Sequence, residues 1–152
     1  MKRHTLLTFI AGALLAASCG GNDTQKAADE MYSKAEQLFN EGKYDRAKIA
    51  IDSLRKIFPS AVETRRKALS LYQNISLKEA QEDLAITDNQ LQQVTHDYNY
   101  LRVKVEKDKA ELRATPDELE MLTRTKMKLD SLKVRFDMQC AKIKYIHKKQ
   151  KE

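Results

Sequence analysis

Apolar residues recur in a seven-residue pattern along the middle of the chain, with polar and charged residues between them. The pattern has two rows: Leu77, Leu84, Leu91, Tyr98, Val105 and Leu112 in the first, and Ala80, Thr87, Val94, Leu101 and Asp108 in the second. A repeat sustained this long predicts one long helix whose narrow apolar seam is covered by another helix. The polar seam residues, Thr87 and Asp108, either set the register or are tolerated near solvent.

A second long helix is predicted after a short break. The stretch Thr115-Pro116-Asp117-Glu118 combines an N-cap Thr, a Pro at the first helical position and a capping-box Glu. The helix before it is expected to end near Ala114, and the helix after it near Lys149. The second seam consists of Leu122, Leu129, Leu132, Phe136, Ile143 and Ile146, with Leu119 and Cys140 beside it. Two helices joined this closely most simply fold back, so residues 76–152 are predicted to form an antiparallel coiled-coil hairpin.

Residues 27–75 show shorter helical patterns. One apolar face, ending at Phe39, precedes Gly42, which suits the left-handed position that ends a helix. A second face precedes Pro59, and Ser60-Ala61-Val62-Glu63 predicts the start of a third helix as a capping box. The apolar residues of the first two faces are Ala28, Met31, Ala35, Leu38 and Phe39, and Ala47, Ala50, Ile51, Leu54, Ile57 and Phe58.

The third helix poses a choice. A turn at Asn74-Ile75-Ser76, followed by the capping box Ser76-Leu77-Lys78-Glu79, would separate it from the heptad stretch. The stripe of Leu69 and Tyr72 is out of phase with the stripe that begins at Leu77, which favours the turn. One continuous helix from Ala61 to Arg113 is the alternative.

The first hairpin resembles a tetratricopeptide repeat, a helical unit of about 34 residues. With Ala28 as the first position, the residues that match that family's packing positions are Met31, Ala35, Leu38, Ala47, Ile51 and Leu54, with Pro59 at the terminal proline. The family's Trp is missing. In that family a concave groove binds peptide segments, so the resemblance makes four residues candidates for binding a partner protein: Met31, Lys34, Leu38 and Arg65.

The N-terminus has the features of a secretory signal. Lys2 and Arg3 precede an apolar run of about a dozen residues, too short for a membrane span. The run ends in Leu15-Ala16-Ala17-Ser18-Cys19, followed by Gly20-Gly21, which resembles the lipobox of bacterial lipoproteins, with the aliphatic residue one position early. The resemblance implies a signal peptide over 1–18 and a lipidated (for example palmitoylated) Cys19. The small and polar residues that follow predict a flexible tether, so that 19–26 would comprise the lipidated Cys and the tether. The lipobox resemblance also implies an outer-membrane protein that faces the periplasm, with surface exposure as the alternative.

Composition supports long solvated helices: charged residues make up 33% of 152 residues, and the formal net charge of +6 is too small and too mixed to indicate nucleic acid. With Cys19 as the anchor, Cys140 is the only remaining cysteine, and we expect it to be buried rather than to cross-link two copies. The motif Asp-Ser-Leu at Asp52 and Asp130 is similar to bacterial O-glycosylation sites.

No catalytic, phosphate-binding or metal-binding motif stands out, so we expect a non-enzyme without cofactors or metals. The leading hypothesis is an all-α, lipid-anchored periplasmic adaptor or scaffold that binds another envelope protein. The alternative is a coiled-coil spacer that self-associates as a homodimer and contacts anionic lipid or another polyanion through a basic end, formed by Lys142, Lys144, Lys148, Lys149 and Lys151.

Overall fold

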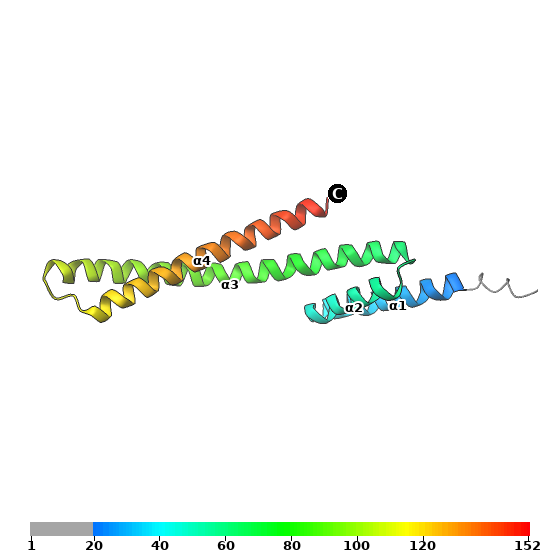
Figure 1. Ribbon diagram of the computed structural model, residues 1–152, viewed down its shortest axis with the longest axis horizontal. Helices are drawn as coiled ribbons and strands as arrows, with labels where there is room; N and C mark the ends of the chain where they lie inside the picture. Colours follow the sequence, from blue (N-terminus) through cyan, green and yellow to red (C-terminus); the bar gives the residue numbers. More distant parts are fainter. Residues whose placement is uncertain (1–19) are drawn as a thin grey trace, which may run out of the picture. The chain divides into compact units, whose positions relative to one another are not determined.

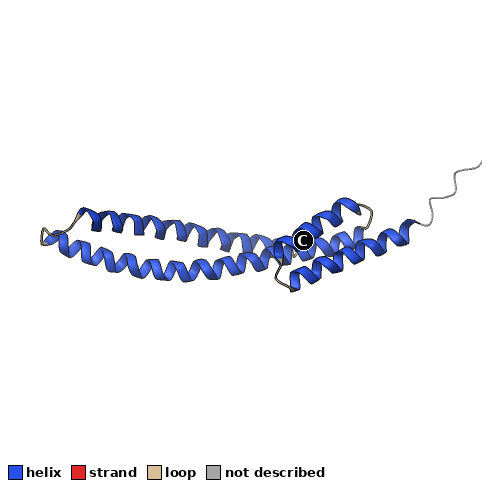
Figure 2. Ribbon diagram, turned by 90° about the horizontal axis from the view of Figure 1, so that it is seen from below, coloured by secondary structure: helices blue, strands red, loops and turns tan. Residues whose placement is uncertain are grey.

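The computed structural model describes residues 20–152, and within them the chain is all-helical, as predicted (Figures 1 and 2). Its helices are α1 (Gly20–Asn40), α2 (Tyr44–Ile57), α3 (Val62–Ala110) and α4 (Pro116–Lys149). The predicted signal peptide and the predicted lipid anchor, Cys19, lie outside the described residues. The chain divides into two compact units, the first ending at Leu69 and the second running from Ser70 to Glu152.

The turn between α1 and α2 closes as the sequence predicts. Gly42 has a φ of +72°, the left-handed conformation that Gly adopts without steric cost. The Lys43 N–H donates to the Leu38 carbonyl at 2.9 Å, which satisfies one of the carbonyls left open at the helix end. The rings of Phe39 and Tyr44 lie 5.9 Å apart between centroids and so join the two helices across the turn.

Small side chains form much of the core of the first unit. Ala28 and Ala35 of α1 and Ala47 of α2 are fully buried, as are Ile51 and Leu54 of α2. Alanine lets two helix backbones approach closely, and the two larger side chains then fill the remaining space. The residues at these positions are therefore buried as a repeat-like hairpin requires, although the likeness to a tetratricopeptide repeat itself stays a prediction.

The predicted flexible tether is wrong for residues 20–26, because α1 already begins at Gly20. Gln25, inside that stretch, donates a hydrogen bond to Thr64 at 2.6 Å, and Ala28 just after it is fully buried. These contacts order the beginning of α1, which the small and polar composition of the segment does not indicate.

The predicted turn at residues 74–76 is also wrong: α3 runs without a break from Val62 to Ala110, close to the continuous alternative. The buried residues shift phase there, from Leu71 and Ile75 to Ala80 and Thr87. A straight helix accommodates such a shift by burying a different face along its length, and no Gly or Pro at 74–76 forces it to end. The start is one residue later than predicted, because Ala61 accepts the first helical bond, from Arg65, at 2.9 Å.

Contacts between α3 and α4 define their direction. Asn74 pairs with Gln150 at 2.8 Å, Asp83 with Arg135, and Lys104 with Glu118. Partner numbers on α4 fall as numbers on α3 rise, so the two helices run antiparallel, as Figures 1 and 2 also show. Interlocking coiled-coil packing along the pair stays a prediction.

Seam residues lie where the heptad pattern places them. Val94, Leu129 and Leu132 form a buried cluster against which Leu91 and Tyr98 pack. From Leu77 to Asp108 every predicted seam position of α3 is buried or half-buried, and on α4 all six seam residues are too. The narrow stripe on α3 is thus covered by the stripe on α4, and part of each is removed from water.

The start of α4 also agrees with the sequence. The Thr115 Oγ1 accepts a hydrogen bond from the Glu118 N–H at 3.3 Å, and the Thr115 N–H donates to the Glu118 carboxylate at 3.0 Å. Both bonds of the capping box are therefore present, with Pro116 as the first helical residue. This start fixes where the chain turns back.

The end of α3 differs from the prediction. The helix stops at Ala110 rather than near Ala114, and Leu112 is 95% exposed instead of occupying the seam. Its φ of 56° is left-handed, an uncommon conformation for a residue with a branched side chain. The Arg113 N–H donates to the Asp108 carbonyl at 2.7 Å and closes the turn around this residue. The heptad rule fails here because the turn, rather than the seam, determines the position of Leu112.

We expect Leu112→Gly to raise the free energy of unfolding. Left-handed backbone costs a residue with a Cβ about 1–2 kcal/mol, and the flexibility that Gly adds to the unfolded chain offsets about 0.4–1 kcal/mol of this. The net gain is therefore between about 0 and about 1.6 kcal/mol, measured by urea unfolding. Leu112→Ala is the control, because it removes the exposed side chain and keeps the Cβ. A Gly variant less stable than the Ala variant would contradict the explanation.

Candidate functional site

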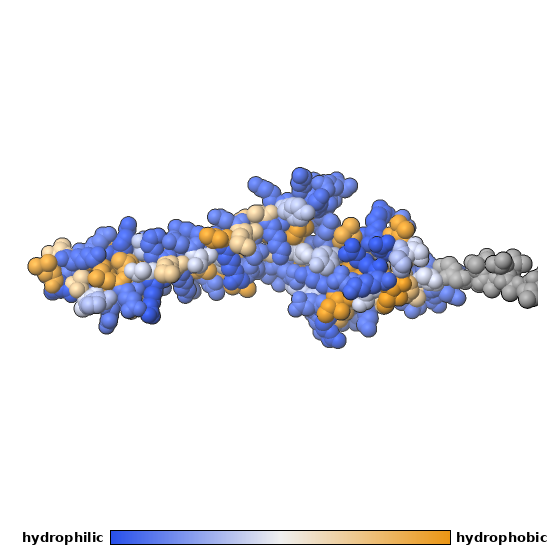
Figure 3. Space-filling view, viewed as in Figure 1, coloured by the Kyte–Doolittle hydropathy of each residue, from blue (hydrophilic) through white to orange (hydrophobic). Residues whose placement is uncertain are grey.

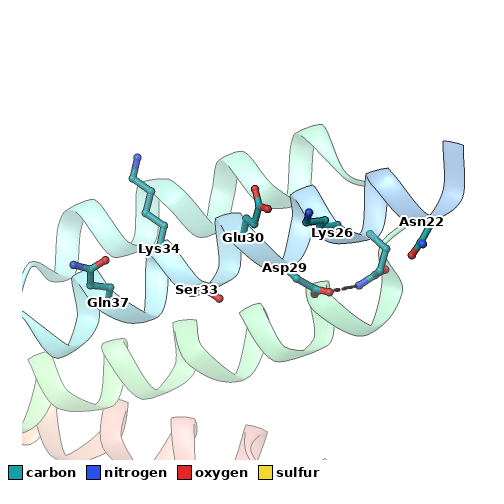
Figure 4. Close-up of a pocket in the computed structure, with 8 residues that line it drawn as sticks. Asn22, Lys26, Asp29, Glu30, Ser33, Lys34 and Gln37 are labelled. Carbon is teal, nitrogen blue, oxygen red and sulfur yellow. Dashed lines mark hydrogen bonds between the residues drawn. The ribbon is translucent and has the colours of Figure 1, made fainter.

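A groove open to solvent runs along α1 in the first unit (Figure 4). Every residue that lines it is polar or charged, with both signs of charge present. The lining consists of Asn22, Gln25, Lys26, Asp29, Glu30, Ser33, Lys34 and Gln37. An open surface of this kind offers hydrogen-bond donors and acceptors along about 22 Å of helix.

One carboxylate of the groove is held in place from α3. The hydroxyl of Thr64, which is fully buried, donates to the Asp29 Oδ1 at 2.6 Å. The Gln25 amide donates to the Thr64 hydroxyl oxygen at 2.6 Å and to both Asp29 carboxylate oxygens at 3.1 Å. Figure 4 draws the contact with Asp29 as a dashed line. The hydrogen bond from Thr64, followed by the one from Gln25, lowers the pKa of Asp29. Asp29 is therefore a fixed anion at neutral pH.

The four sequence candidates for partner binding do not lie together in this groove. Lys34 lines it, whereas Met31 and Leu38 are half-buried residues of α1 outside the lining. Arg65 is half-buried and its Nη1 donates to the Pro59 carbonyl at 2.8 Å, so it helps to hold the connection between α2 and α3.

Sequence reasoning missed the group formed by Gln25, Asp29 and Thr64. The spacing of Gln25 and Asp29, four residues apart, is typical of neighbours on one helix face and could have indicated their pairing. Nothing in the local sequence marks Thr64, because its partners lie far away along the chain.

A second groove lies near the hairpin end of α3, in the second unit. Its lining consists of His96, Asn99, Tyr100, Val103, Lys104, Lys107 and Asp108. The Lys104 ammonium bonds Asp108 at 3.0 Å and also bonds Glu118 of α4. The hydrogen bond from Lys104, with those from Thr115, lowers the pKa of Glu118 to about 2, and the pKa of Lys104 is raised by the same contact and by Asp108. Lys104, at the centre of these contacts, thus joins α3 to α4.

The predicted basic end is exposed on the last turns of α4 and just after it. Lys149 bonds Glu152 at 2.6 Å and lies 6.0 Å from the centre of the Tyr145 ring. The contact with Glu152 raises the pKa of Lys149. Part of the positive charge of this end is therefore neutralised within the chain.

The prediction that Cys140 is buried is wrong, because the residue is exposed. It lies on α4 just beside the seam. Within residues 20–152, no helix is long and apolar enough to cross a membrane, and no group of His, Cys, Asp or Glu is arranged to hold a metal ion.

Comparisons with known proteins found no matching family model, no matching curated protein and no matching solved structure.

We expect stability to depend on the charge of Glu118 in acid. A pKa lowered from 4.5 to about 2 means that its contribution is fully present above about pH 4.5 and is lost as the pH falls toward 2. The wild type should therefore exceed Glu118→Gln in free energy of unfolding at pH 6, with the difference shrinking toward pH 2, as measured by urea unfolding at each pH.

Glutamine keeps the cap, so the comparison isolates the charge. Glu120→Gln is the matched control, because Glu120 pairs with Arg124 on the exposed surface of the same helix and does not join α4 to α3. A difference between wild type and Glu118→Gln that stays constant from pH 6 to pH 2 would contradict this assignment.

Proposed function

We propose that this protein is a lipid-anchored, non-catalytic adaptor of the bacterial envelope that binds another envelope protein through the groove on α1. The lipid would be carried by Cys19, with the protein on the outer membrane and facing the periplasm. The observation that carries the proposal is the fixed carboxylate of Asp29 in an open groove of mixed charge.

The chemistry of the groove suits an extended or helical polypeptide with charges of both signs. Asp29 is held by a buried hydroxyl, so a partner's Lys, Arg or backbone N–H meets an acceptor that is already oriented. Lys26 and Lys34, in the same lining, are suited to carboxylates of the partner. Such opposed charges contribute more to specificity and association rate than to affinity.

The resemblance of the first hairpin to a tetratricopeptide repeat supports the same proposal, since that family binds peptide segments along its first helices. In this chain, however, the lining consists of polar residues of α1 rather than the half-buried Met31 and Leu38. We therefore assign partner contact to the polar side of α1, with Lys34 as the sequence candidate that it retains.

A photo-cross-linking amino acid placed at Ser33, an exposed groove residue, tests the proposal in intact cells. We expect one discrete adduct with a second protein in the membrane fraction. Lys34→Glu in the same chain should weaken that adduct several-fold, because it reverses one of the charges that the partner meets.

Asp45, exposed on α2 and outside the groove, is the control position for the cross-linker. Cys19→Ser should move the protein to the soluble fraction and abolish the adduct. The same adduct from Asp45, or none from Ser33, would contradict partner binding at the groove, and retention of Cys19→Ser on the membrane would contradict the anchor.

A further inference from the structure

A second apolar stripe runs along the outside of α4. Four of its six positions lie two residues after a seam residue, about 200° round the helix, and the stripe thus faces away from α3. Its members are all exposed, with Met127, Val134, Met138 and Tyr145 each about 60% exposed. The full stripe, called the outer stripe below, consists of Met127, Ser131, Val134, Met138, Ala141 and Tyr145.

The spacing distinguishes this stripe from scattered surface residues. Single exposed apolar side chains are ordinary, but these five, together with the small polar Ser131, alternate at intervals of four and three residues over about 27 Å of helix. That alternation is the pattern of a helix–helix seam. Figure 3 shows apolar patches scattered between the charged residues on the face in view. The regularity indicates that another helix covers the outer stripe.

Charges at the two edges of the outer stripe identify the covering helix. One edge, just after Met127, Val134 and Ala141, is basic throughout: Lys128, Arg135 and Lys142. The other edge, just before Ser131, Met138 and Tyr145, carries Asp130, Asp137 and Lys144. In a parallel pair of such helices, a residue on one edge faces the partner residue five positions later on the opposite edge.

A second copy of α4 in parallel orientation matches these edges. Asp130 then faces Arg135 of the second copy, and Asp137 faces Lys142, and symmetry forms each pair twice. Lys144 faces Lys149, a repulsion that Glu152 reduces because it already bonds Lys149 at 2.6 Å. An antiparallel pair would instead set the basic edges against each other, with Arg135 beside Arg135.

The contacts that Asp130 and Arg135 make within the chain do not prevent them from pairing with a second copy. Asp130 bonds Lys126 at 2.9 Å, and both side chains are more than half exposed, so this weak surface pair is easily shared. Arg135 bonds Asp83 of α3 and is also half exposed. Its guanidinium has five N–H donors, so it can keep its bond to Asp83 and donate to a second carboxylate.

We infer that two copies of this chain pair in parallel through the outer stripe of α4. The two-fold axis of such a pair runs along the helices, so equivalent residues of the two copies lie at the same height. Two copies anchored through Cys19 in one membrane satisfy this condition. The inference concerns α4 and is independent of partner binding at the α1 groove.

Cysteine cross-linking of the full chain in membranes tests the inference, in a Cys140→Ser background. Met127→Cys and Tyr145→Cys, made separately, should each give a disulfide-linked band of twice the chain mass on mild oxidation. Only in a parallel pair does each end of the stripe lie against the same end of the second copy. In an antiparallel pair, Met127 and Tyr145 each lie about 27 Å from the equivalent residue of the second copy. Lys133→Cys, exposed on the flank of the helix, and the background alone should give no such band.

A charge swap supplies the second measurement. Asp137→Lys should remove most of the cross-linked band of Tyr145→Cys, and adding Lys142→Asp should restore it. Circular dichroism checks that each variant remains helical. Cross-linking at neither end, at the flank as strongly as at the stripe, or to a protein of another mass would overturn the inference, as would a charge swap that fails to restore the band.

Discussion

The second unit depends on one constraint, the narrowness of the apolar seam on α3. Its rows leave most of the helix surface polar or charged, so a single helix is enough to cover the seam, and α4 does so with the seam from Leu122 to Ile146. The buried cluster of Val94, Leu129 and Leu132 is the centre of that contact. Because each helix alone would expose its stripe to water, neither is expected to be stable without the other. The turn between them is therefore as important as the seams.

Polar contacts at three levels fix the register of the pair. Lys104 and Glu118 join the helices at the hairpin end, Asp83 and Arg135 join them further along, and Asn74 and Gln150 join them at the other end. Thr87 is fully buried in the seam, and its hydroxyl has no hydrogen-bond partner among residues 20–152, so it contributes volume rather than polar specificity. Register thus comes from ion pairs and hydrogen bonds at the rim of the seam.

Periodicity and capping chemistry predicted much of this arrangement, because both are local in the sequence. The Thr115 cap and the seam from Leu77 to Asp108 are of this kind. The misses have a common origin in tertiary contact. The helix at residues 20–26 and the bond between Asp29 and Thr64 depend on contacts with residues far along the chain. The exposure of Leu112 follows from a turn that heptad spacing does not describe. Of the candidate site, only Lys34 could be named in advance.

Paired spin labels test the folding back of α4 on α3 most directly. With both native cysteines replaced by serine, one sample carries labels at the exposed positions Gln81 and Lys142, and a second at Gln81 and Glu120. Dilution with unlabelled protein restricts the measurement to distances within one chain. The antiparallel hairpin predicts a short, narrow distance for the first pair. It predicts a clearly longer distance for the second pair, because Glu120 lies about 30 Å further along the helix axis than Lys142. A first pair that is farther apart than the second would contradict the account.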